Sequence, residues 1–176
     1  MTTDPAPANP TSTQQNTEAE PGTSPTGFVH AQINVSDLDR SLAFYEMLGF
    51  EVIGQGTITD PDLFAALGLD GRRLRGAFLR IPGRSTKVTP MLDMIQFIDP
   101  PPQGSPYPAL NHLGIARICF QVDDIEAAER RLIAQGIETL GPIGELRTKA
   151  NMVGKVLCFK DPDGTILEYS EIDVSS

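Results

Sequence analysis

Alternating hydrophobic and polar residues mark the first predicted element of the chain. Phe28–Val35 places three polar residues on one side, which are His30, Gln32 and Asn34. A period of two residues is typical of a β-strand with one buried face. Ser36 and Asp37 follow as capping residues of a predicted helix, Leu38–Leu48, and Gly49 ends that helix.

This order of elements occurs twice. An ungapped offset of 87 residues aligns Asp37 with Asp124 and Gly49 with Gly136. The first unit continues with a strand, a short helix and two strands, which are Phe50–Ile53, Asp60–Leu69, Leu74–Ile81 and Met91–Ile98. The second unit is predicted as Ile115–Val122 (strand), Ile125–Gln135 (helix), Ile137–Leu140, Lys155–Phe159 and Ile166–Glu171 (strands). We therefore predict an α+β fold of paired βαβββ modules.

The repeat relates four polar residues on four strands. His30 aligns with Arg117 at the offset of 87, and Asp93 aligns with Glu168 at an offset of 75. Strand alternation places Arg117 on the same side as Gln121. A polar sheet face packs poorly in a core unless it lines a cavity. The alternative is that this face is simply the solvent side of the sheet, and alternation alone leaves both interpretations open.

Composition limits the class of protein. Residues 1–26 lack aromatic side chains, so we expect a disordered tail followed by one domain over 27–172. The net charge is -9 without a dense basic run, which argues against nucleic acid and membrane partners. No apolar run approaches the ~20 residues of a membrane span, and no signal peptide is evident, so we expect a soluble, cytoplasmic protein. Cys119 and Cys158 lie in apolar runs, and we expect both to be reduced.

Three motifs resemble the vicinal oxygen chelate superfamily, which includes glyoxalase I, methylmalonyl-CoA epimerase, extradiol dioxygenases and bleomycin-resistance proteins. They are Phe28–Phe50, Ala116–Ile125 and Phe159–Glu168. The resemblance implies a first module at about 27–98, a linker at 99–114 and a second module at about 115–172, with the sheets curled around a shared cleft. It also implies a small-molecule ligand and a homodimer.

The resemblance further implies positions for metal ligands. In metal-dependent members each of four strands contributes one ligand, and the matching residues are His30, Asp93, Arg117 and Glu168. Gln96 competes with Asp93 for its position, but the two lie on opposite sides of one strand and the internal match to Glu168 favours Asp93. Arg117 cannot ligate a metal because a guanidinium has no lone pair to offer.

Two readings of this position remain. His30, Asp93 and Glu168 could hold a divalent ion, for which Ni, Zn, Mn, Fe and Co are the candidates. Alternatively Arg117 replaces the ion and pairs with the carboxylates, and we expect this arrangement, which needs no cofactor. We also expect Cys119 to be a buried structural thiol and His112 to lie in a loop or at the rim of the cavity.

Two classes of function follow from the resemblance. The first is a lyase or isomerase, similar to glyoxalase or epimerase, acting on a small oxygenated molecule, with an anionic one as an option. Glu168 or Asp93 would be the general base, His30 a proton partner and Arg117 the group that holds an oxyanion. The second is a metal-free binding or sequestering protein of the bleomycin-resistance type, and an extradiol-type dioxygenase is a distant third. In each class we expect substrate contacts from Arg117, Gln32, Asn34 and Gln121.

Overall fold

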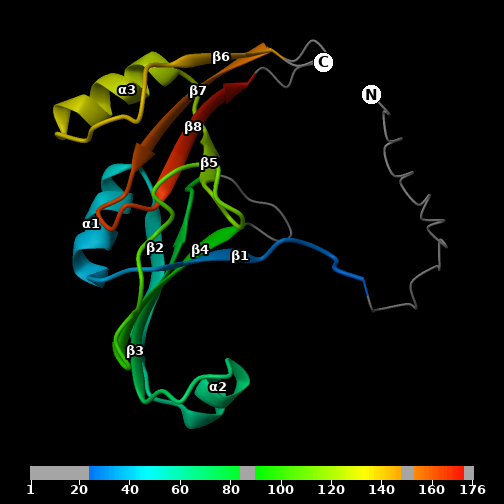
Figure 1. The fold of residues 1–176 in the computed structure, drawn as a ribbon, viewed down its shortest axis with the longest axis vertical. Coiled ribbons are helices and arrows are strands. Elements are labelled where there is room, and N and C mark those ends of the chain that lie inside the picture. The colour runs from blue at the N-terminus through cyan, green and yellow to red at the C-terminus, as the bar shows by residue number, and fades with distance from the viewer. Residues whose placement is uncertain (1–23, 84–89, 148–152, 173–176) are drawn as a thin grey trace, which may run out of the picture.

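Two four-stranded sheets, each covered on one face by a helix, make up the molecule (Figure 1). The structure is a computed structural model, and it describes residues 24–83, 90–147 and 153–172. Most of the predicted tail, residues 84–89 and residues 148–152 therefore lie outside the described residues. Among the described helices, none is long and apolar enough to cross a membrane.

Each sheet belongs to one module. The first module contains β1 (His30–Asn34), α1 (Leu38–Met47), β2 (Glu51–Ile58), α2 (Pro61–Ala66), β3 (Arg73–Arg80) and β4 (Met91–Asp99). The second contains β5 (Ile118–Gln121), α3 (Ile125–Ala134), β6 (Gly144–Arg147), β7 (Val153–Lys160) and β8 (Ile166–Ile172). The helix α2 stands apart from the rest at the far end of the first sheet (Figure 1).

The strand pairing confirms the internal repeat. The strand orders are β1-β4-β3-β2 and β5-β8-β7-β6, and the first pair in each sheet is parallel. Ala31 pairs with Leu92, and Ile118 pairs with Leu167. These two pairs are related by the same offsets of 87 and 75 residues that the sequence shows. The predicted α+β fold of paired modules with mixed sheets is confirmed.

The two modules share one hydrophobic core. Its buried residues include Leu38 and Tyr45 from α1 and Leu157 and Leu167 from β7 and β8. Burial of apolar surface from both modules in this core makes the main favourable contribution to the free energy that holds the modules together. Polar contacts add to it at the turn between β7 and β8, where the Tyr45 hydroxyl donates to Asp161 Oδ2 at 3.2 Å.

Several predicted strands differ from the observed ones, and β2 ends at Ile58 rather than at the predicted Ile53. The predicted strand Ile137–Leu140 is reduced to one bridge, between Thr139 and Phe159, and the strand β6 begins only at Gly144. Gly141 and Pro142 lie between them, and proline cannot donate to a ladder. The strand β5 begins at Ile118 rather than at Ile115, so Arg117 lies just before the strand.

Candidate functional site

A cavity of about 1010 Å³ lies where the two modules and the linker meet. Residues 32–36 of β1 and its exit form one side, and residues 115–118 at the entry of β5 form another. The linker segment 100–107 closes it together with Leu69, Phe97, the turn residues Asp163 and Thr165, and Ile166 at the start of β8. The cavity is therefore built from segments that are distant in sequence.

The predicted polar face of β1 is exposed. Ile33 is buried, whereas His30, Gln32 and Asn34 are exposed, as strand alternation predicts. Gln32 Nε2 donates to Asn34 Oδ1 at 2.8 Å, and both residues line the cavity. Gln121, the third amide predicted to contact a substrate, is exposed and is not part of the cavity wall.

His30 and Asp93 lie together on the face of the first sheet. His30 Nε2 and Asp93 Oδ2 are 4.0 Å apart, and the Asp93 side chain is mostly buried. Burial raises the pKa of the Asp93 carboxyl, and the nearby His30 only partly opposes this change. The Phe78 ring lies 6.3 Å from the His30 ring, which gives this pair an apolar neighbour. Neither His30 nor Asp93 lines the cavity.

Arg117 and Glu168 form the equivalent pair in the second module. Arg117 Nε lies 2.7 Å from Glu168 Oε2. The Glu168 side chain is 8% exposed, whereas that of Arg117 is 44% exposed. The buried carboxylate therefore has a cationic partner, as a buried charge requires, and Arg117 extends from it into the cavity wall.

Two thiols flank the Glu168 carboxylate across neighbouring strands. Cys119 on β5 and Cys158 on β7 both pair in register with Glu168 on β8. The Cys158 thiol donates to Glu168 Oε2 at 3.6 Å. Burial of the sulfur and contact with Glu168 raise the pKa of Cys119 to about 12. The expectation that Cys119 is a buried residue is wrong, because it is exposed overall even though its sulfur lies against Glu168.

The residues at the predicted metal position do not fit a metal ion in this geometry. Within the described ranges, one group of three potential ligands has donor atoms within 4.8 Å of one another, and it is Asp124, Glu126 and Glu171. His30, Asp93 and Glu168 do not converge in this way. Arg117 instead forms an ion pair with Glu168. Its guanidinium contacts Oε2, which is one of the carboxylate oxygens that a metal ion would need as a ligand.

The acidic group in the second module has a structural explanation. Lys155 Nζ lies 2.6 Å from Glu126 Oε1 and 3.8 Å from Glu171 Oε1. Glu171 Oε2 also accepts from the Ile125 N–H at the start of α3. These carboxylates are therefore already committed to a lysine and a helix N-terminus.

The structure also separates Asp93 from Gln96. Gln96 Oε1 accepts from the Leu38 N–H at 3.3 Å, and its Nε2 donates to the Ser36 carbonyl at 2.9 Å. Gln96 therefore faces α1, while Asp93 lies beside His30 on the other face of the sheet. Glu171 performs the same capping role in the second module at the offset of 75 residues.

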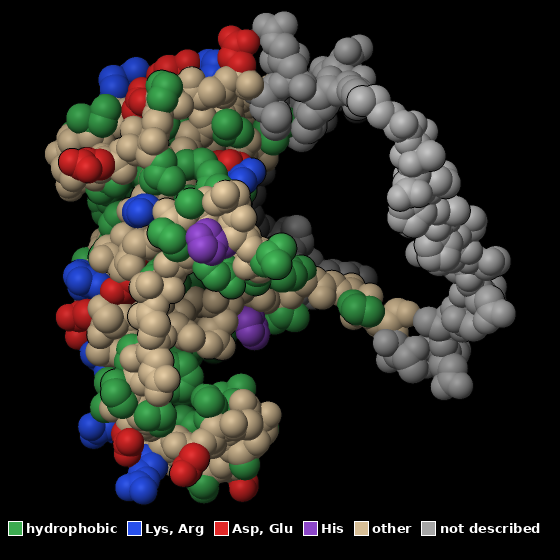
Figure 2. Space-filling model, in the orientation of Figure 1, with side chains coloured by type: hydrophobic (Ala, Val, Ile, Leu, Met, Phe, Trp, Pro, Cys, Tyr) green, Lys and Arg blue, Asp and Glu red, His purple; other side chains and the backbone are tan. Residues whose placement is uncertain are grey.

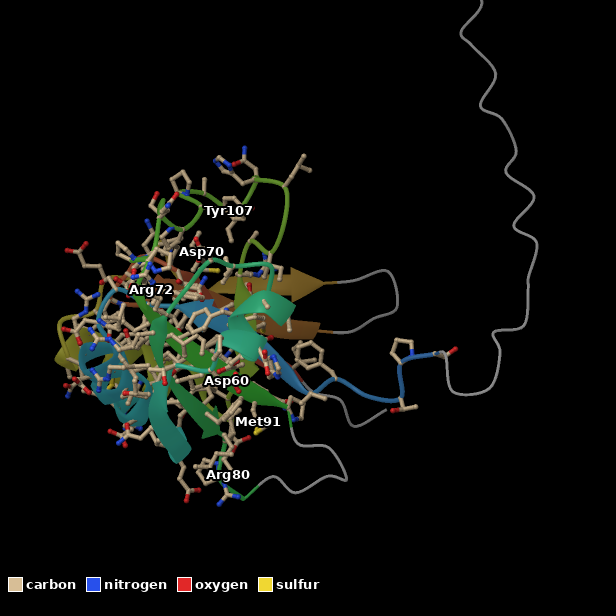
Figure 3. The ribbon with its side chains drawn as sticks, turned by 90° about the horizontal axis from the view of Figure 1, so that it is seen from below. Asp60, Asp70, Arg72, Arg80, Met91 and Tyr107 are labelled. Atoms are coloured by element: carbon tan, nitrogen blue, oxygen red, sulfur yellow. The ribbon has the colours of Figure 1, made fainter. Side chains whose placement is uncertain are left out.

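Sequence reasoning missed the part of the cavity wall that comes from the linker and the last turn. The linker prolines indicated only a connection, yet Pro100, Pro101, Pro102 and Pro106 line the cavity together with Tyr107. Figure 3 shows Tyr107 on the linker loop. The exposed His112 ring stacks on Tyr107, with ring centroids 5.5 Å apart. A tyrosine within a proline-rich linker was the available signal.

Comparisons with known proteins agree with this architecture. A family model described as Glyoxalase/Bleomycin resistance protein/Dioxygenase superfamily matches residues 27–169. A glyoxalase family protein from Bacillus cereus has a TM-score of 0.74 and 20% identity, with 88% of this chain and 99% of that chain covered. No curated protein sequence matches the chain.

Two further solved structures are similar. A glyoxylase/bleomycin resistance protein/dioxygenase domain from Frankia sp. EAN1pec has a TM-score of 0.60 and 21% identity, with 85% and 100% of the two chains covered. A glyoxalase family protein from Enterococcus faecalis has a TM-score of 0.57 and 26% identity, with 83% and 98% covered. Each relative is covered almost completely, so the chain spans the length of this fold.

Proposed function

The chain belongs to the Glyoxalase/Bleomycin resistance protein/Dioxygenase superfamily, and from this premise we propose that it binds a small oxygenated molecule in the cavity between its modules without a resident metal ion. The observation that carries the proposal is the Arg117–Glu168 ion pair, with 2.7 Å between Nε and Oε2. It lies at the position where the resemblance implies two metal ligands. A cation that belongs to the chain thus neutralises the buried carboxylate in place of an ion.

The cavity itself favours binding over catalysis. Among its described lining residues, Asp163 is the one carboxylate, and it accepts hydrogen bonds from the Ser36 backbone N–H and hydroxyl. Arg40 also pairs with Asp163. A general base needs a free lone pair within reach of the substrate. The wall of the cavity offers amides, hydroxyls and a guanidinium, which suit recognition.

Metal content tests the first part of the proposal. The protein is purified without a His-tag or chelator, and its bound Mn, Fe, Co, Ni and Zn are quantified before and after exposure to each ion. We expect the wild-type chain to stay free of metal. We expect Arg117→His to gain an ion, because the substitution frees Glu168 and adds an imidazole. Tight binding of one ion per chain by the wild type, lost in His30→Ala, would show that the proposal is wrong.

A lyase or isomerase is the second candidate, and the His30–Asp93 pair is the observation that favours it. Asp93 is a mostly buried carboxyl whose pKa is raised by burial, and it has an imidazole as its neighbour. Such a pair is suited to moving a proton to and from carbon. Asp93 or Glu168 would act as the base, with His30 as the proton partner. Arg117 would hold the oxyanion.

Proton exchange distinguishes this candidate from binding alone. Hydroxyacetone and lactate are incubated with the protein in D₂O. NMR follows the loss of the C–H proton on the carbon atom that carries the hydroxyl group. Catalysis predicts exchange that Asp93→Asn abolishes, whereas Asp99→Asn, at the exposed end of the same strand, retains it. Exchange that is equal in wild type and Asp93→Asn would rule out this base.

A further inference from the structure

The cavity has two chemically different walls. Its apolar wall includes Leu69, Phe97, the linker prolines, Tyr107 and Ile115. Its polar wall includes Gln32, Asn34, Ser36, Arg117, Asp163 and Thr165. At about 1010 Å³ the cavity is at the upper end of the range of small-molecule sites, which is about 300 to 1,000 Å³. A ligand that fills it has a polar end and a substantial apolar body.

Arg117 sets the sign of the polar end. Among the described lining residues it is the only cation, and Asp163 is already paired with Arg40. The Glu168 carboxylate contacts Arg117 through Nε. A guanidinium carries five N–H donors in a planar fork, so its two terminal nitrogens can bind the oxygens of an anion bidentately. The Arg117 side chain as a whole is 44% exposed, and it lines the cavity.

Within the apolar wall, Tyr107 is held in place by Gly114 and His112. Gly114 has φ +109, and a Cβ built there would lie 2.7 Å from the Tyr107 hydroxyl oxygen. Only glycine permits both this backbone conformation and this close approach. Tyr107 is also stacked on His112. Ile115 is 81% exposed and Leu113 is 93% exposed next to it, so apolar surface continues out of the cavity. Figure 2 shows hydrophobic side chains gathered around the histidines on this face.

We infer that the ligand of this cavity is an amphipathic organic anion, which binds with its acidic group on the terminal nitrogens of Arg117 and its apolar or aromatic body against Tyr107 and the linker prolines. This rests on the proposed function, because it names the class of molecule that the same cavity takes. Burial of the ligand's apolar body contributes to the binding free energy in proportion to the apolar area that it covers. The acidic group contributes a charge-assisted, bidentate contact.

Two fluorescent probes of matched shape test the inference. Anilinonaphthalene sulfonate is an aromatic anion, and N-phenylnaphthylamine has the same rings without the charge. Fluorescence titrations give the Kd of each dye for the wild type and for Arg117→Gln/Glu168→Gln. The double variant removes both charges, so that no buried carboxylate is left unpaired. Circular dichroism confirms that it folds. Arg130→Gln, on the exposed side of α3, is the control for a lost positive charge.

We expect the double variant to bind the sulfonate about tenfold more weakly, since a hydrogen bond to a charged group has about this effect on affinity. Binding of the neutral dye stays within about twofold of the wild type, because its contacts are apolar. Tyr107→Ala weakens the binding of both dyes, and Arg130→Gln changes neither.

The outcomes separate the inference from the function on which it rests. If neither dye binds to the wild type, the cavity is not a binding site of this kind and the proposed function fails together with the inference. If both dyes bind equally well to the wild type and to the double variant, but Tyr107→Ala weakens them, the cavity binds ligands without a preference for anions. Only the inference is then overturned. If the sulfonate binds to every variant as tightly as to the wild type, the dye binds outside the cavity, and the inference is overturned in this case as well.

Discussion

Glu168 is the residue on which the polar side chains of the second sheet converge. The residue as a whole is 6% exposed, and an ionised carboxylate that is buried to this extent requires hydrogen-bond donors around it. Arg117 supplies a cation, and Cys158 donates its thiol hydrogen to the same oxygen. The ionisation of the neighbouring thiols therefore depends on this carboxylate.

Alkylation of Cys119 tests that dependence. Burial raises the pKa of the Cys119 thiol to about 12, and the adjacent Glu168 adds to the effect. Because the thiolate is the nucleophile, we expect the rate of Cys119 alkylation by iodoacetamide to keep rising about tenfold per pH unit between pH ~8 and ~10. An ordinary cysteine levels off near its pKa of about 8.5. The rate is measured by peptide mass spectrometry, which separates Cys119 from Cys158.

Glu168→Gln provides the comparison, because it removes the charge while keeping the shape. We expect a lower Cys119 pKa in this variant, and therefore faster alkylation at pH ~8. A wild-type rate that levels off by pH ~9, or a rate unchanged by Glu168→Gln, would contradict the role of Glu168.

The pairing at this residue could be anticipated from the sequence, but its surroundings could not. The repeat and the chemistry of guanidinium together predicted that Arg117 would pair with both Asp93 and Glu168. The structure pairs Arg117 with Glu168, whereas Asp93 lies beside His30. Exposure of Cys119 was not predictable, because strand alternation identifies a face without showing which loops cover it. The catalytic and substrate-binding roles assigned to these residues stay predictions.

At the scale of elements, α1 and α3 start in the same way. Asp37 accepts from the Arg40 N–H and Asp124 from the Ala127 N–H, which is ordinary N-capping. A second cap comes from the last strand of each module, where Gln96 accepts from Leu38 N–H and Glu171 from Ile125 N–H. The strand and the helix of each module are thus locked together by one long side chain.

Substitution of these side chains tests the second cap. We expect Gln96→Ala and Glu171→Ala each to lower the free energy of unfolding by about 0.5–2 kcal/mol, since each leaves a helix N–H without its acceptor. The change is measured by urea denaturation. Gln55→Ala, on the exposed strand β2, controls for the loss of a glutamine side chain. A Gln96→Ala protein as stable as Gln55→Ala would show that the cap contributes nothing.

The elements themselves were predicted with uneven success. Helix starts were recognised because Ser-Asp and Asp-Asp capping pairs precede apolar residues at helical spacing. The strand Ile137–Leu140 was misplaced by analogy with the first module, where Val52 pairs with Leu79 and the ladder continues past a register shift to Ile58. Thr139 makes the equivalent pair with Phe159, but Gly141 and Pro142 interrupt the ladder after it. A proline two residues beyond a short apolar run was the warning.

At the scale of the whole molecule, the two modules meet around one polar junction next to the shared core. The turn Asp161–Gly164 of the second module lies against the start of α1 in the first. Asp163 accepts from the Ser36 backbone N–H at 2.9 Å and pairs with Arg40, and Asp161 accepts from Tyr45. Because Ser36 and Asp163 also line the cavity, this junction fixes the relative position of its walls. Whether two such chains form the expected homodimer stays a prediction.

Acid stability tests the junction. Burial of Asp163 opposes its ionisation, but the hydrogen bonds from Ser36 and the Arg40 cation outweigh burial and lower the pKa of Asp163 below its ordinary value of 3.8. A carboxyl whose pKa is lower in the folded state stabilises the fold above its unfolded pKa, and this contribution is lost as the pH falls through the folded pKa. We therefore expect Asp163→Asn to be less stable than the wild type by about 1–2 kcal/mol near neutral pH.

The difference between wild type and Asp163→Asn should shrink as the pH falls below about 4, because the wild-type carboxyl then becomes protonated and also loses its charge. Urea denaturation at several pH values measures this difference in stability, with Asp70→Asn in an exposed loop as the matched control.

Since the junction also shapes the cavity, Asp163→Asn should weaken binding of both naphthalene dyes, whereas Asp70→Asn should not. A stability difference that stays constant from pH ~7 to ~3 would show that the charge of Asp163 does not hold the modules together.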